Sequence, residues 1–143
     1  MRRMLIGMLV GGLLGVGGMA LGRLQEAREA PKTVSVRDIT EKLDGKDAKV
    51  TVVELTINPG QTGTPHRHPG PVFGYVLEGE YELGLDDQPS KVLKAGETFY
   101  EPTNALHRVS KNPAASGKTR VLAVLVHPRD AKSLATPERK DEE

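Results

Sequence analysis

Apolar and polar residues alternate over short stretches of this chain, which is the pattern of strands that bury one face. Between Glu80 and Leu85 every second residue is apolar, and Lys49–Ile57 carries a similar alternation. Arg120–Val126 is almost wholly apolar, as expected for a strand covered on both faces. Turn signals such as Asn-Pro-Gly at 58–60 separate these runs. The expected strands are residues 33–36, 49–57, 73–78, 80–85, 92–93, 98–100, 106–110 and 120–126.

Composition agrees with an all-β protein. The chain has 143 residues, which suits one domain with one core, and its 16 glycines and 10 prolines favour many turns over a helical bundle. No internal repeat is evident, so one barrel or sandwich is expected. The absence of cysteine excludes a disulfide framework and a thiolate metal ligand. The formal net charge is +1 and the charges are scattered, so nucleic-acid binding has no support.

The N-terminus is typical of an exported protein. Arg2 and Arg3 precede the uncharged, glycine-rich run Leu5–Leu21. A basic start followed by an apolar run indicates a secretory signal or an N-terminal membrane anchor. Whether residues 1–22 are cleaved is left open; if uncleaved, they attach the protein to the membrane. Either way, we expect the domain in the periplasm or on the outer face of the inner membrane.

The rest of the chain divides by composition. Residues 1–22 are the signal peptide or anchor, and the polar residues 23–32, which end just after Pro31, are expected to be a linker. Residues 33–128 hold the strands. Residues 129–143 are a charged C-terminal tail, with a short helix expected near its start.

Three histidines in two short segments carry the chemistry. His66 and His68 stand two residues apart, and on an extended strand such residues project from the same face. His107, on a neighbouring strand, can complete a pocket of three imidazole nitrogens. Imidazole suits Fe, Zn, Cu, Ni and Mn as a ligand. The pattern therefore indicates a site for one divalent transition metal, whose identity is left open.

The two segments resemble the paired motifs of the cupin superfamily. The first motif is a glycine, five residues, His-x-His, three or four residues, a glutamate, six residues and a glycine. The residues that match it are Gly60, His66, His68 and Gly79. The second is a glycine, five residues, Pro-x-Gly, two residues, a histidine, three residues and an asparagine. The residues that match it are Gly96, Pro102 and His107.

The second motif departs from the family at two positions. Asn104 replaces its middle glycine, a tolerable change because asparagine also adopts positive φ. The terminal asparagine is displaced by one position, to Asn112. The resemblance covers about residues 45–127 and implies a double-stranded β-helix, the jelly-roll cupin barrel, behind the N-terminal hydrophobic segment. It also implies His66, His68 and His107 as metal ligands.

The first motif lacks its glutamate, because Val72 occupies that position. Without this carboxylate, a three-histidine site would keep the full charge of a divalent metal and attract anionic ligands. Replacement carboxylates are available in principle, although each is expected to be a solvated or rim residue: Glu54, Glu78 and Glu101. Tyr75 and Tyr100 are possible hydrogen-bond donors to a bound ligand, but packing is the expected role. His127 is expected at the surface.

These residues support two hypotheses for function. In the first, the protein is a metal-dependent dioxygenase, resembling the quercetin-dioxygenase-like cupins, that acts on a small oxygenated or anionic organic molecule. In the second, the barrel is a non-catalytic module that binds a small ligand or a metal. Cupins also include isomerases and decarboxylases, and the sequence does not separate these from oxygenases. Whether the chain forms a homodimer is left open.

Overall fold

Ten β-strands and no helix make up residues 30–138, the part of the chain that this computed structural model describes. The expected signal or anchor, and most of the expected linker, lie outside these residues. Within them, no helix has the length and apolar character that a membrane crossing needs. The strands are β1 (Lys32–Leu43), β2 (Lys46–Ile57), β3 (His66–Arg67), β4 (Val72–Glu78), β5 (Glu80–Leu85), β6 (Lys91–Lys94), β7 (Thr98–Glu101), β8 (Leu106–Lys111), β9 (Thr119–Pro128) and β10 (Thr136–Pro137).

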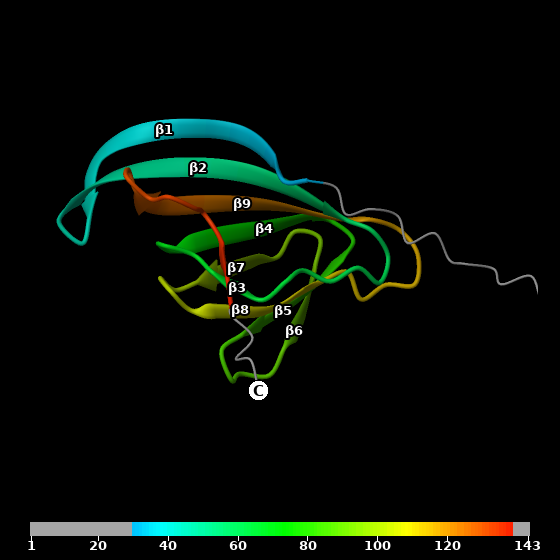
Figure 1. Cartoon of the computed structure of the whole chain (residues 1–143). Coiled ribbons are helices and arrows are strands. Elements are labelled where there is room, and N and C mark those ends of the chain that lie inside the picture. Colours follow the sequence, from blue (N-terminus) through cyan, green and yellow to red (C-terminus); the bar gives the residue numbers. More distant parts are fainter. Residues whose placement is uncertain (1–29, 139–143) are drawn as a thin grey trace, which may run out of the picture.

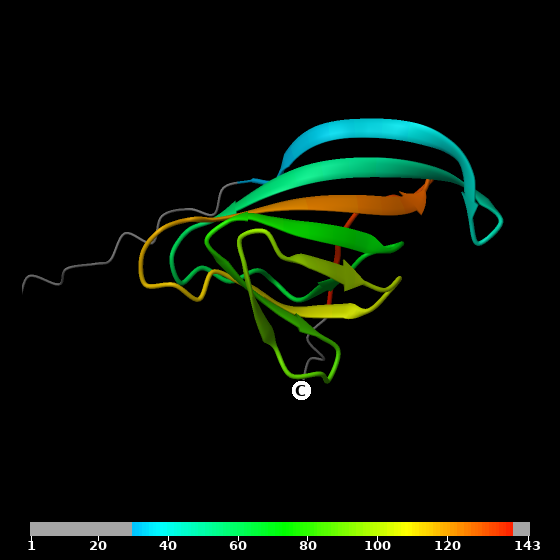
Figure 2. The ribbon, with the colours of Figure 1, turned by 180° about the vertical axis from the view of Figure 1, so that it is seen from behind.

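The strands form two antiparallel sheets that face each other (Figure 1). One sheet has the order β1-β2-β9-β4-β7 and the other the order β10-β3-β8-β5-β6. From behind, β1 and β2 form a long curved hairpin along the outer edge of the first sheet (Figure 2). This arrangement confirms the predicted all-β class.

The core lies between the sheets and follows the alternation read from the sequence. Along β4 and β9 every second side chain is buried, which is what a sheet with one face against a core requires. Residues of both sheets form one buried cluster: Ile57, Val76, Tyr81, Leu83 and Val121. A second cluster, Val72, Ala123 and Leu125, belongs to the first sheet alone. The core is therefore aliphatic, with Tyr81 as its buried tyrosine among the described residues.

Gly74 lets an aromatic ring lie across β4. It pairs in register with Phe99 on β7, and a Cβ on Gly74 would stand 1.9 Å from the Phe99 ring. Phe99 occupies that space and packs against Tyr81, with ring centroids 5.4 Å apart. A glycine in a strand often marks such a close approach.

Two segments differ from the sequence expectations. The first strand is expected over residues 33–36 but runs to Leu43, because it pairs with β2 along its length and turns back at Asp44-Gly45. The helix expected after Pro128 does not form. Instead, the Ala131 N–H donates to the Pro128 carbonyl in a turn. The chain then crosses to the second sheet, where β10 pairs with β3 (Figure 1).

Candidate metal centre

Sheet register brings the three predicted histidines together. His66 on β3 pairs directly with His107 on β8, so both side chains project from the same face of the second sheet. His68 follows two residues after His66. Ring centroids lie 4.7 Å apart for His66 and His68 and 4.8 Å apart for His66 and His107. One ring nitrogen of each histidine lies within 4.8 Å of the others, a spacing that could hold a metal ion.

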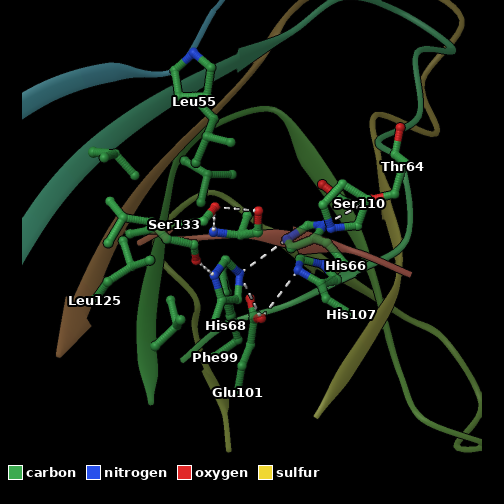
Figure 3. A pocket seen from close by; sticks show the side chains of 18 of the residues that line it. Leu55, Thr64, His66, His68, Phe99, Glu101, His107, Ser110, Leu125 and Ser133 are labelled. Atoms are coloured by element: carbon green, nitrogen blue, oxygen red, sulfur yellow. Dashed lines mark hydrogen bonds and ion pairs between the residues drawn. The ribbon is translucent and has the colours of Figure 1, made fainter. Parts of the chain in front are cut away.

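Backbone carbonyls define the tautomers of two of these rings. His66 Nδ1 lies 2.7 Å from the Thr64 carbonyl oxygen, and His68 Nδ1 lies 2.5 Å from the Leu134 carbonyl oxygen. A carbonyl can only accept a hydrogen bond, so each Nδ1 carries a proton and donates it. In the neutral rings, both Nε2 atoms then present lone pairs. These two Nε2 atoms are 3.0 Å apart (Figure 3).

The environment of His66 favours the neutral ring. Burial lowers the pKa of His66, and the nearby His107 and His68 act in the same direction. The Thr64 carbonyl and Glu101 raise the pKa of His66 but do not reverse the shift. At neutral pH the His66 ring is therefore neutral, with its proton on Nδ1 and a free lone pair on Nε2. This is the form that a metal ligand needs.

The His107 ring is oriented by a hydrogen bond to the Tyr81 hydroxyl, which is itself bonded to Ser110. The Tyr81 hydroxyl donates to Ser110 Oγ at 3.1 Å and lies 3.2 Å from His107 Nε2. Because its one proton goes to Ser110, the hydroxyl accepts from Nε2–H of His107. The lone pair of neutral His107 is then on Nδ1. The tyrosine at the site is thus Tyr81 on β5, which sequence reasoning did not single out for chemistry.

Glu101 is the residue whose position differs most from expectation. The sequence placed it with the solvated or rim carboxylates, but it is 3% exposed at the end of β7, so that expectation was wrong. Its Oε2 lies 3.1 Å from His107 Nδ1 and 3.5 Å from His68 Nε2 (Figure 3). Neither this oxygen nor His107 Nδ1 has a hydrogen-bond partner among residues 30–138.

The other carboxylates considered for the site lie elsewhere. Glu54 accepts hydrogen bonds from the Arg120 guanidinium at 2.8 and 2.6 Å. Glu78 is exposed and lies 3.7 Å from the same guanidinium. Neither lines the pocket that contains the histidines. Both are therefore structural partners of Arg120.

Three further residues weighed from the sequence also lie away from the histidines. Tyr75 and Tyr100 are exposed, and Tyr100 packs against Phe73 with ring centroids 5.3 Å apart. His127, expected at the surface, is buried instead. Its ring bonds to Thr51 Oγ1 at 2.9 Å and to the Pro128 carbonyl at 2.8 Å. It is a satisfied core histidine.

The histidines and Glu101 line a pocket of about 560 Å³ between the sheets. Most of its other walls are apolar, including Val53, Leu55, Val72, Phe99, Val121, Ala123 and Leu125. Exposed residues from both ends of the described chain, among them Pro31, Ser133 and Ala135, also contribute to its lining. No lysine or arginine of the described chain lines the pocket. Among the described residues, the groups that can bring positive charge to this pocket are therefore its histidines, either protonated or holding a cation.

The donor set fits a divalent transition metal. Bonds of about 2.1 Å place neighbouring donors roughly 3.0 Å apart around an octahedral ion and roughly 3.4 Å apart around a tetrahedral one. The separations here are 3.0 Å between the His66 and His68 Nε2 atoms and 3.1 and 3.5 Å from Glu101 to the His107 and His68 nitrogens. A shared cation would stabilise donors at these distances. The three histidine nitrogens as a set span up to 4.8 Å, more than two bonds of about 2.1 Å can reach, so the histidines would draw closer together around a bound ion.

A family model described as a cupin domain matches residues 53–125, half of the chain. The chain belongs to the cupin superfamily. The matched range contains all three histidines. Asn104, which replaces the glycine of the second cupin motif, has φ of 61°, as its position in the motif predicts. None of the curated proteins matches the chain significantly.

Solved structures share the cupin fold at low sequence identity. A conserved protein with a double-stranded β-helix domain from Klebsiella pneumoniae has a TM-score of 0.61 and 22% identity, over 82% of this chain and 90% of that one. A DMSP lyase from Ruegeria pomeroyi has a TM-score of 0.57 and 20% identity, over 88% of this chain and 59% of that one. A polyketide cyclase from Streptomyces resistomycificus has a TM-score of 0.53 and 23% identity, over 78% of this chain and 77% of that one. These likenesses concern the fold alone.

Proposed function

We propose that this cupin binds one divalent transition metal through His66, His68 and His107 and uses it on a small organic molecule held in the pocket. One observation carries the proposal. The Nε2 atoms of His66 and His68 are 3.0 Å apart, and in the neutral rings the hydrogen bonds at Nδ1 leave both Nε2 atoms without a proton. Two facing lone pairs repel unless a cation lies between them. Because burial lowers the pKa of His66, a metal ion fits this position better than a shared proton.

The pocket walls favour a ligand with a mainly apolar body. Aliphatic side chains and Phe99 would contact that body, while the polar end of the ligand would lie beside the histidines. The predicted small oxygenated molecule has this character. A polyanion does not, since no lysine or arginine of residues 30–138 lines the pocket to neutralise it.

Oxygenation is the reaction that we propose first. A redox-active metal such as iron would supply the electron chemistry when bound. The chain would hold the substrate between the sheets, exclude bulk water with its aliphatic walls, and keep His107 oriented through Tyr81. The Tyr81–Ser110 pair is the observation that favours a second candidate, an isomerase or decarboxylase. A hydrogen-bonded hydroxyl beside the site could take part in proton transfer.

Oxygen uptake separates catalysis from simple binding. The iron(II)-loaded protein should consume oxygen in the presence of a flavonol probe, quercetin, and release a product detectable by mass spectrometry. A variant lacking His66 and His107 should do neither. A thermal shift with quercetin, without oxygen uptake or product, would instead support the binding module. A product formed without oxygen uptake would support the isomerase or decarboxylase.

Export stays a proposal that rests on residues 1–22. A reporter protein fused after Pro31 should be active only outside the cytoplasm, because the basic residues before the apolar run favour translocation of the downstream chain. The same fusion with Arg2 and Arg3 replaced by glutamate is the control, and its export should fall. A wild-type fusion that remains in the cytosolic fraction would contradict export.

A further inference from the structure

We infer that Glu101 supplies the carboxylate that the first cupin motif lacks at Val72, an inference that rests on the proposed metal site. Val72 on β4 and Glu101 on β7 are direct register partners. Directly paired residues of neighbouring strands project from the same face of a sheet. Both side chains line the pocket, and they are 1% and 3% exposed. The carboxylate has thus moved one strand sideways, within the same sheet and on the same face.

Burial makes a structural role without a cation costly for Glu101. An ionised carboxylate is stable in a protein interior when it is paired or bound to a metal. Glu101 Oε2 has no hydrogen-bond donor among the described residues. It faces His107 Nδ1 at 3.1 Å, and that nitrogen carries a lone pair when Nε2 donates to Tyr81. A metal ion bound by both the Glu101 oxygen and the His107 nitrogen would replace the repulsion between their lone pairs with attraction.

A fourth ligand changes the charge of the centre. With three neutral histidines, the site would keep the full charge of a divalent metal, as the sequence alone predicts. With Glu101 bound, one of these charges is cancelled. Affinity for small anions should then be lower than in a site of three histidines. For the same reason, a centre with Glu101 bound favours neutral or singly charged substrates over more highly charged anions.

Cobalt(II) titration followed by visible absorption tests the role of Glu101. We compare wild type, Glu101→Gln, the exchange variant Val72→Glu/Glu101→Val, and the control Glu78→Gln. Glu78 is an exposed glutamate at the end of the neighbouring strand β4. Glu101→Gln should lower cobalt affinity at least tenfold and raise azide affinity of the cobalt form. The exchange variant conserves volume and returns the carboxylate to the motif position, so it should restore much of the cobalt affinity. Glu78→Gln should match wild type.

The outcomes separate this inference from the metal site itself. If wild type binds cobalt and loses it on replacement of His66, but Glu101→Gln changes neither cobalt nor azide affinity, the inference about Glu101 is overturned and the histidine site stands. If wild type binds no cobalt, the metal site fails first. A loss of cobalt affinity in Glu101→Gln with unchanged azide affinity would make Glu101 a positioning residue for His107 and would also overturn its role as a ligand. If the exchange variant does not fold, by circular dichroism, the azide comparison decides alone.

Discussion

Replacing His66 and His107 together by alanine should abolish metal binding. These residues are direct register partners on β3 and β8. The double variant therefore removes two of the three neighbouring ligand nitrogens. Each single replacement should weaken binding by at least tenfold, because a mononuclear centre depends on every protein ligand. Elemental analysis of protein equilibrated with zinc should find about one metal per chain in wild type and none in the double variant.

His127→Ala is the matched control for this experiment. His127 is also a buried histidine, but its ring is bonded to Thr51 and to the Pro128 carbonyl and does not line the pocket. This variant should lose stability through the unpaired Thr51 hydroxyl while keeping its metal. Equal metal content in wild type and in the His66 and His107 double variant would contradict the assignment of these ligands.

Removing the metal with a chelator should lower the melting temperature markedly. A ligand present at 1,000 times its dissociation constant stabilises the folded state by about 4 kcal/mol. For a domain of this size, such a change corresponds to a shift on the order of 10 °C or more. Relief of the repulsion between its lone pairs and the Glu101 carboxylate is part of this binding free energy. Calorimetry with and without a chelator measures the difference.

The His66 and His107 double variant controls for nonspecific effects of the chelator. Without the ligand set, its melting temperature should not respond to metal or chelator. The prediction fails if the wild-type protein melts at the same temperature with zinc and with chelator, since metal bound to the folded state must stabilise it.

Local patterns were enough to predict much of the fold. Alternation predicted most of the strands correctly, since a half-buried strand must repeat every two residues. The i, i+2 spacing of His66 and His68 is also a local property. The convergence of His107 with them and the positive φ of Asn104 followed from the cupin motifs, and the structure bears out both. Local patterns therefore predicted most of the strands, but not the extent of β1 or the turn after Pro128.

Contacts between distant strands were not predictable in the same way. Glu101 stands next to a proline in a polar turn, which suggests solvent exposure, and only the pairing of β7 with β4 places it opposite Val72. The Leu134 carbonyl reaches His68 because the segment after β9 crosses to the second sheet. Arg120 engages Glu54 by the same kind of long-range pairing. Register, which single-residue patterns do not encode, decided each of these cases.

Anomalous diffraction from crystals of the cobalt-loaded protein tests the central claim most directly. Data collected at the cobalt absorption edge should show one peak per chain, within bonding distance of His66 Nε2, His68 Nε2 and a ring nitrogen of His107. The same map reports whether a Glu101 oxygen is bound. A fully loaded crystal with no peak among the three histidines, or with its peak elsewhere on the chain, would contradict the three-histidine metal centre.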